Sequence, residues 1–267
     1  MKPSLHLTFF HANGYPSGVY RQFFEGLERH AQVHAPPVLD SAPDCAAHRR
    51  WPAMLDQALS LTQSRVGGRH VLVGHSMGGY LALQAAARHP EAVSAVVLID
   101  SPIPTGWRGK LLSVSQLTGL AYRAGPAPIA ARRRDHWSSR EGAREFFAGK
   151  AFVQRWAPGV LDDFVAHALV PAADGGVTLR VPRNTERDIY AHLVHGSALR
   201  ALQRLRRSGI RVYFIAGTES EETRMAGYAQ NERLFAPHFH ALPTGHLIPM
   251  ETPAGCAALV LKLAASA

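Results

Sequence analysis

The sequence predicts an α/β fold, with a mostly parallel central sheet and helices on both faces. Short apolar runs such as Val71–Val73 and Ala95–Ile99 are typical of strands that are buried on both sides. Segments with helical periodicity alternate with these runs, which is the pattern of a parallel sheet. Between Val71–Val73 and the helix expected from Tyr80 onward lies the tight turn Gly74-His75-Ser76-Met77-Gly78.

The Gly-x-Ser-x-Gly spacing around Ser76 is typical of a nucleophile elbow, a strained strand-to-helix turn that exposes its central side chain. Gly74 and Gly78 lack Cβ atoms, so the strand and the helix can approach closely on either side of Ser76. The N-terminus of the following helix offers free N–H groups and a positive dipole end to a developing oxyanion. We therefore interpret Ser76 as a nucleophile.

Size and composition indicate an ordinary globular protein. The 267 residues are 46% hydrophobic and 18% charged, which fits one large domain with an insertion or two domains. No apolar run approaches the length of a membrane span, and Leu5–Phe10 is too short for a signal-peptide core. We expect a cytoplasmic protein in which Cys45 and Cys256 are free thiols.

The net charge of +9 comes almost entirely from arginine. A basic surface can attract nucleic acid or anionic lipid. No nucleic-acid motif is present, and the tightest cluster, Arg132-Arg133-Arg134, is followed directly by Asp135. We expect a solvated basic face with no nucleic-acid partner, and the sequence leaves the oligomeric state open.

The elements before the insertion follow in order. Leu5–Phe10 is the first predicted strand, and apolar residues at helical spacing predict helices around Phe23–Leu27 and over 49–62. Val33–Leu39 is a weaker strand, and its pair of prolines favours an edge of the sheet.

The alternation then stops. Residues 102–196 contain short helical patterns, such as Arg140–Lys150 and Leu161–Leu169, and no further buried-strand run. We expect a helical cap over the carboxyl edge of the sheet, inserted between the core segments 1–101 and 197–267. Most of its aromatic residues should form the core of the cap: Trp107, Trp137, Phe146, Phe147, Phe152, Trp156 and Phe164.

Regular alternation returns after the cap. Leu199–Arg207 and Ala226–Leu234 are predicted helices, Ile210–Ala216 and Phe239–Leu242 are predicted strands, and Pro253–Ala265 is the closing helix. The loops after these two strands should meet the nucleophile turn at one edge of the sheet.

A serine hydroxyl needs an adjacent base to react at neutral pH. His246 follows the last predicted strand, at the sheet edge that carries Ser76, and is the expected base. His75 should point away across the turn, and His11 lies beside the loop after the first strand. We interpret both as supporting residues.

A carboxylate should orient the base. Glu219, Glu221 and Glu222 lie in the loop after the strand that precedes the His246 strand, and an acid there satisfies the chain order Ser, acid, His. Asp100 is a rival because it ends the strand after the nucleophile, at the same edge. For the oxyanion hole we expect the backbone N–H of Met77 and the N–H of Tyr15, which follows Gly14.

Three motifs together resemble serine hydrolases of the α/β-hydrolase fold superfamily over nearly the whole chain: His11-Ala12-Asn13-Gly14-Tyr15-Pro16, Gly74-His75-Ser76-Met77-Gly78-Gly79 and Gly245-His246. The resemblance implies an esterase-like reaction through a covalent acyl-enzyme, with no cofactor and no metal. Many members carry an Asp where this chain has Ser220. A known variant has the acid one position later, which favours Glu221, followed by Asp100 and Glu219.

Two classes of function remain open. The first is an enzyme that hydrolyses a small or medium acyl ester, or that uses the same triad on a C–C bond, on a lactone or in acyl transfer. The second is a ligand-binding receptor on this fold whose triad no longer turns over.

Overall fold

The computed structural model describes residues 5–40, 44–63 and 69–266. Its main sheet has six parallel strands in the order β2-β1-β3-β4-β8-β9. The strands are β1 (Leu5–Phe10), β2 (Ala31–His34), β3 (His70–His75), β4 (Val93–Ile99), β8 (Arg211–Gly217) and β9 (Phe239–Leu242). The strand expected over Val33–Leu39 begins and ends earlier, and it lies at the predicted edge.

The apolar runs become strands because both faces of the sheet are covered. Val71 and Val73 pack into one hydrophobic cluster, whereas Leu72 between them packs into the other. Successive side chains of a strand point to opposite faces, so a strand buried on both sides has no polar alternation. The central position of β3 therefore follows directly from its continuous apolar sequence.

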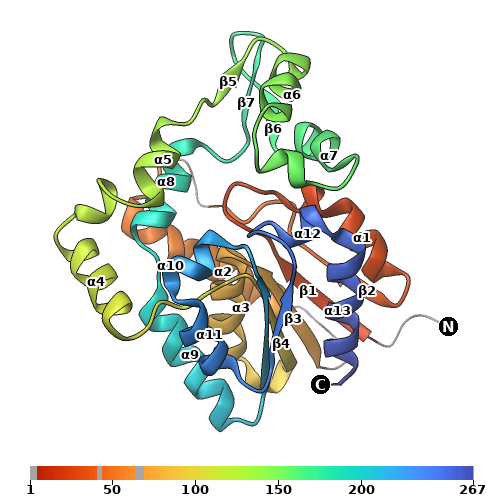
Figure 1. Ribbon diagram of the computed structural model, residues 1–267, viewed down its shortest axis with the longest axis vertical. Helices are drawn as coiled ribbons and strands as arrows, with labels where there is room; N and C mark the ends of the chain where they lie inside the picture. Colours follow the sequence, from red (N-terminus) through yellow and green to blue (C-terminus); the bar gives the residue numbers. More distant parts are fainter. Residues whose placement is uncertain (1–4, 41–43, 64–68, 267) are drawn as a thin grey trace.

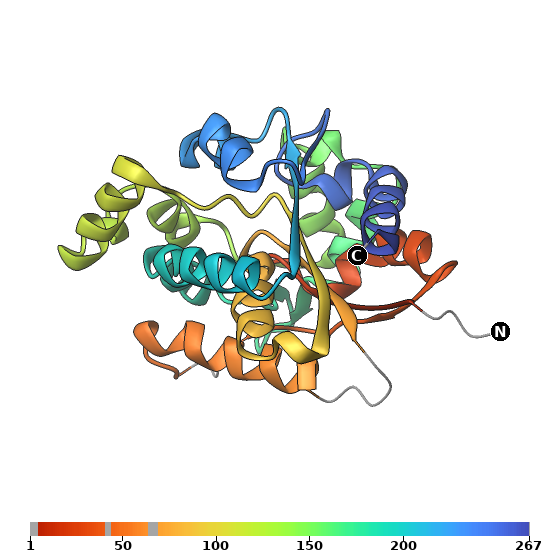
Figure 2. The ribbon, with the colours of Figure 1, turned by 90° about the horizontal axis from the view of Figure 1, so that it is seen from below.

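Helices cover each face of the sheet (Figures 1 and 2). One face carries α1 (Arg21–Glu28) and α13 (Pro253–Ala265), which pack against each other. The other face carries α2 (Arg50–Gln63), α3 (Met77–Arg88) and α9 (His195–Arg207). The shorter helices α10 (Glu221–Ala226), α11 (Tyr228–Phe235) and α12 (Ile248–Glu251) lie in the connections that follow β8 and β9.

The segment between β4 and α9 adds helices and a second, small sheet beyond one end of the main sheet (Figure 1). Its helices are α4 (Gly106–Leu117), α5 (Pro126–Arg132), α6 (Arg140–Ala148), α7 (Val160–His167) and α8 (Arg183–Ala191). The small sheet is antiparallel, in the order β5-β7-β6, with strands β5 (His136–Trp137), β6 (Leu169–Pro171) and β7 (Val177–Leu179). Strands of two or three residues are too short to show a periodicity, so the sequence indicated helices alone.

Most aromatic residues of this segment are buried, but in a cluster that they share with the main sheet and not in a core of the cap alone. Trp137, Phe147, Trp156 and Phe164 are buried in the main hydrophobic cluster, but Trp107 and Phe152 are exposed. The buried pair Arg50–Asp188 (3.0 Å) ties the segment to the core, because it joins α2 to α8. In the part of the chain that the structure describes, no helix has the length and apolar character needed to cross a bilayer.

Candidate active site

Ser76 lies between β3 and α3 in a strained backbone conformation, with φ at 52°. Positive φ is costly for a residue with a Cβ and is kept where the surrounding structure enforces it. Here the enforcement is steric, since a Cβ on Gly78 would lie 1.9 Å from the Phe10 carbonyl oxygen. The turn that the sequence predicted is therefore present, and Ser76 is only partly buried.

His246 meets Ser76 at this turn. Its Nε2 lies 3.0 Å from the Ser76 Oγ, and its Nδ1 lies 2.6 Å from the Oδ2 of Asp100. A carboxylate only accepts hydrogen bonds, so in the neutral ring the proton is on Nδ1. The lone pair of Nε2 then faces the serine hydroxyl, which is the arrangement needed to remove its proton.

Asp100 is fully buried and is held by four donors. Oδ1 accepts from the Gly217 N–H (2.9 Å) and the Thr223 hydroxyl (3.0 Å). Oδ2 accepts from the Ser220 hydroxyl (2.5 Å) as well as from His246. The backbone of Asp100 also has positive φ, 41°, so both Ser76 and Asp100 end their strands in strained turns. Four donors fix the carboxylate in one orientation.

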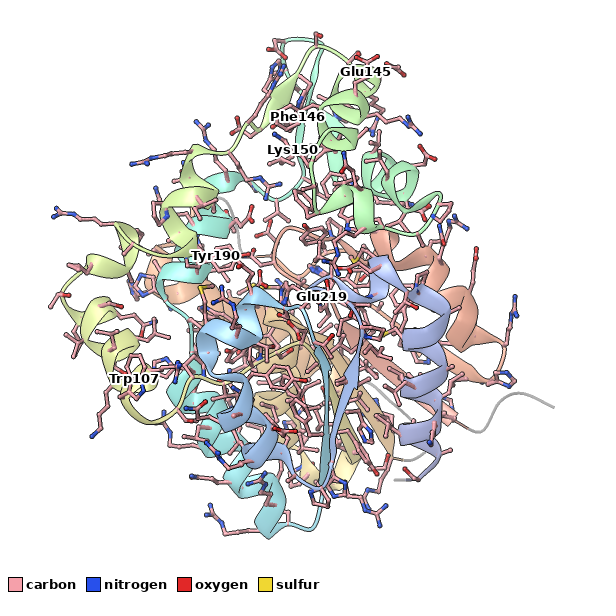
Figure 3. All side chains as sticks on the ribbon, in the orientation of Figure 1. Trp107, Glu145, Phe146, Lys150, Tyr190 and Glu219 are labelled. Carbon is pink, nitrogen blue, oxygen red and sulfur yellow. The ribbon has the colours of Figure 1, made fainter. Side chains whose placement is uncertain are left out.

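The structure does not bring Glu221, the preferred acid of the sequence analysis, to His246. Glu221 is exposed and pairs with Arg224 one turn later in α10 (2.9 Å). Glu219 pairs instead with Arg155 (2.8 Å), and Figure 3 labels it beyond the end of the main sheet. Ser220 is the N-cap of α10, so the residue after it enters the first helical turn and faces solvent. The geometry thus favours Asp100, the rival.

Of the two N–H groups expected in the oxyanion hole, one is free to bind a substrate oxygen and the other is already bonded. Met77 is the first residue of α3, so its N–H has no acceptor within the helix and borders the nucleophile. The Tyr15 N–H instead donates to the Ala12 carbonyl oxygen (3.1 Å) inside its own loop. That donor would reach a substrate only if the turn opened, so the Tyr15 assignment remains a prediction that this conformation does not favour.

His75 does not simply point away across the turn, because its ring lies 5.3 Å from the ring of His246. Its contacts and those of His11 fit the supporting role that the sequence predicts for both. The His75 Nε2–H donates to the backbone carbonyl of His246 (3.0 Å), and its Nδ1 accepts from the Tyr20 hydroxyl (2.7 Å). Burial, helped by the nearby charge of His246, lowers the pKa of His75 to about 3. Burial likewise lowers the pKa of His11 to about 4. Both rings therefore stay neutral and act through hydrogen bonds.

Sequence reasoning missed two residues, Glu251 and Arg155, that hold the loop in which His246 lies. Glu251 accepts from the Gly245 N–H (2.9 Å) and pairs with Arg155 (2.9 Å), which comes from the segment above the sheet. Gly245 immediately precedes His246. The only sequence signal was an acidic residue five positions after the base, which is too common a pattern to be informative.

A second carboxylate, Glu222, lies near the base. Its Oε2 is 3.8 Å from the His246 Nδ1, and its side chain is 48% exposed. Burial lowers the pKa of His246, but the hydrogen bond to Asp100 and the charges of Glu222, Asp100 and Glu251 outweigh it. The pKa of His246 is raised above its ordinary value of 6.5.

The loop after β1 is also held by residues of segment 102–196. The Asn13 side-chain amide donates to the Glu186 carbonyl (3.1 Å), and the Glu186 carboxylate pairs with Arg133 while lying beside Gly14. Tyr15 packs edge-on against Trp156, with ring centroids 6.3 Å apart. Burial raises the pKa of Tyr190, which Figure 3 labels, and the charge on Glu186 adds to this rise.

Asp100, Glu222 and His246 are also the described residues whose potential ligand atoms for a metal lie together, within 4.8 Å of one another. The Asp100 and His246 atoms in this group already bond each other, and two further hydroxyls donate to Asp100. The donor set thus fits an oriented hydrogen-bonded triad better than a metal centre.

Comparison with known proteins identifies the family of the chain. A family model described as the alpha/beta hydrolase family matches residues 9–259. Among curated proteins, the lipase LipV of Mycobacterium tuberculosis is 32% identical over 103 residues. The pimeloyl-[acyl-carrier protein] methyl ester esterase of Nitrosomonas europaea is 31% identical over 97 residues. These alignments span 33% and 36% of this chain and only 40% and 36% of the relatives' own lengths.

Solved structures are similar over nearly the whole chain. An E-2-(acetamidomethylene)succinate hydrolase has a TM-score of 0.72 at 20% identity, covering 98% of this chain and 92% of its own. A thioesterase domain from the curacin biosynthetic pathway has a TM-score of 0.76 at 18% identity, with the same coverage. At these identities the likeness concerns the fold alone.

Proposed function

We propose, from the premise that this chain belongs to the alpha/beta hydrolase family, that it is a serine hydrolase acting on small or medium acyl esters. The observation that carries the proposal is the unbroken hydrogen-bonded chain from Ser76 through His246 to Asp100, at a strained turn. The two curated relatives, a lipase and a methyl ester esterase, support an ester as the substrate class. Segment 102–196 would serve as the cap over the site, and the free thiols of Cys45 and Cys256 suit a reducing cytoplasm.

In the proposed reaction, the Nε2 of His246 takes the proton of the Ser76 hydroxyl as its oxygen attacks the ester carbonyl. The Met77 N–H would donate to the oxyanion that forms, and one such donor is worth about 3 kcal/mol in the transition state. His246 then protonates the departing alcohol and leaves an acyl group on Ser76. Water, activated by the same ring, releases the acid. Asp100 keeps the proton on Nδ1 and stabilises the ring when it becomes charged.

A fluorophosphonate probe tests the nucleophile directly. We expect the folded protein to be labelled at Ser76, and labelling to disappear in Ser76→Ala and after unfolding. Ser113→Ala is the matched control, because Ser113 also bonds a histidine, His195 (3.1 Å), but lies within α4 and not at a strained turn. Labelling of that variant should be normal. A folded protein that resists the probe would instead indicate a binding protein without turnover.

Neutralising Glu222 should alter the pH dependence of the reaction. The base must be uncharged, so kcat/KM falls as the pH drops through the raised pKa of His246. Glu222→Gln removes a nearby negative charge and lowers that pKa, so the acid limb should move to lower pH. The half-exposed position limits the shift to less than about one pH unit. Glu221→Gln, which changes the same charge one residue away, is the control and should leave the limb in place. A limb that moves upward in Glu222→Gln would contradict this account.

A further inference from the structure

Helix α4 exposes its apolar side to solvent and turns its small and polar side towards the protein, the opposite of most surface helices. Apart from the partly buried Leu112, the side towards the protein carries small or polar residues: Gly109 is buried, Ser113 bonds His195 (3.1 Å), and Gln116 bonds the Leu193 carbonyl (2.9 Å). The side towards solvent carries apolar residues at helical spacing, and these are Trp107, Leu111, Val114 and Leu117. A surface helix normally buries its apolar side.

The exposure of this apolar side is large. Trp107 is 63% exposed and Leu117 is 87% exposed. Leu120 and Ile129, in the segment that follows α4, are exposed as well. We call the four exposed apolar residues of α4, Trp107, Leu111, Val114 and Leu117, the α4 patch. In both ribbon views α4 lies at the outer margin of the molecule, and Figure 3 labels Trp107 near its start.

Positive charge surrounds the α4 patch. Residues 101–134 contain six arginine or lysine residues and no aspartate or glutamate. Arg133 pairs with Glu186 and Arg134 lies over the Trp137 ring, so the other four cations of the stretch are Arg108, Lys110, Arg123 and Arg132. Arg108 and Lys110 flank the apolar side within α4, and the Arg108 guanidinium lies 4.5 Å from the centre of the Trp107 ring. Arg123 and Arg132 are exposed in the segment that follows α4, which also holds the exposed Leu120 and Ile129.

We propose that the α4 patch docks this protein on an anionic lipid surface. Apolar side chains on one face of a helix enter the boundary between headgroups and acyl chains, while flanking cations contact anionic headgroups. A tryptophan at the end of such a helix suits this boundary, since its ring is apolar and its N–H is polar. A second copy of the chain is a poorer occupant, because a two-fold interface would bring two acid-free basic stretches face to face.

The test is flotation of the full chain with lipid vesicles. The protein should float with phosphatidylcholine vesicles that contain phosphatidylglycerol, less with phosphatidylcholine alone, and less as salt is added. The double variant Leu111→Ser with Leu117→Ser should lower partitioning by about 100-fold, since burying each leucine is worth about tenfold or more. Lys110→Gln with Arg123→Gln should lower it by about 25-fold, or about fivefold for each cation near an anionic surface.

Matched controls distinguish binding through the α4 patch from nonspecific binding by other apolar or basic residues. Phe152→Ser removes another exposed apolar side chain, and Arg29→Gln with Arg88→Gln removes two exposed cations from α3 and the end of α1. Neither control should change flotation, and thermal unfolding should show that all variants are folded. Flotation does not depend on turnover, so its outcome is independent of the proposed hydrolysis.

Three results would overturn the proposal. The first is a wild-type protein that does not float with the anionic vesicles. The second is a loss of flotation in Phe152→Ser as large as in the leucine variant. The third is a concentration-dependent dimer in sedimentation that the leucine variant abolishes, which would assign the α4 patch to a second copy.

Discussion

Replacing Ser76 with alanine should lower kcat for ester hydrolysis by a factor on the order of 10⁴ to 10⁶. The hydroxyl is the only group of Ser76 that the proposed reaction uses, and it bonds the base across 3.0 Å. The measurement is hydrolysis of a panel of acyl esters of graded chain length by the purified protein, which also reveals the acyl preference.

The fold should tolerate this change. Ser76 has φ at 52°, and its N–H donates to the Ile99 carbonyl (2.9 Å). Neither feature uses the hydroxyl, so alanine should keep both. The midpoint of thermal unfolding should therefore stay close to that of the wild type. Ser113→Ala serves again as the control and should retain full activity. A Ser76→Ala protein that is folded and still active would remove Ser76 from the reaction.

Replacing Asp100 with asparagine should lower kcat by about 10⁴. An amide that turns its NH₂ toward His246 requires the Nδ1 lone pair there, which moves the ring proton to Nε2. The Nε2 atom that faces Ser76 then already carries a proton and cannot accept the proton of the hydroxyl. Glu221→Gln should change the rate by less than about twofold, because Glu221 bonds only Arg224 at the surface. The reverse order of these two effects would return the acid to Glu221.

Asp100→Asn should also destabilise the protein, so a second variant is needed to separate folding from catalysis. Thr223→Val removes one of the donors to the carboxylate, the hydroxyl that lies 3.0 Å from Oδ1, and leaves the contact between Asp100 and His246 in place. It should cost about 1 kcal/mol in the free energy of unfolding while kcat falls far less than in Asp100→Asn. Equal losses of rate in both variants would indicate that Asp100 has only a structural role.

The strands and the nucleophile turn could be predicted from residues that are close together in the sequence. β1 has the predicted bounds, Leu5–Phe10, and β8 and β9 agree with the predicted strands to within a residue or so. The glycines around Ser76, with a strand before them and a helix after, predicted a close approach of backbone segments, and the structure shows that approach between Gly78 and Phe10. Such features can be predicted because a few neighbouring residues determine them.

The acid could not be selected in this way. Asp100 and His246 are 146 residues apart, and both candidate loops end at the same edge of the sheet. Asp100 and Glu221 differ in the direction in which their side chains point. A positive φ and four donors turn Asp100 towards His246, whereas the N-cap at Ser220 starts a helix that turns Glu221 into solvent. The same limit applies to Tyr15, whose N–H is taken by a bond within its own loop.

By itself, then, the sequence determined the α/β fold, the strained turn at Ser76 and the placement of His246 after the last strand. The tertiary structure decided that Asp100 bonds the base, that Arg155 and Glu251 hold its loop, and that α4 turns its apolar side outward. The physical reason is that periodicity and turn chemistry act between residues close in the chain. Which way a side chain points depends on the elements packed against it, and those come from distant parts of the sequence.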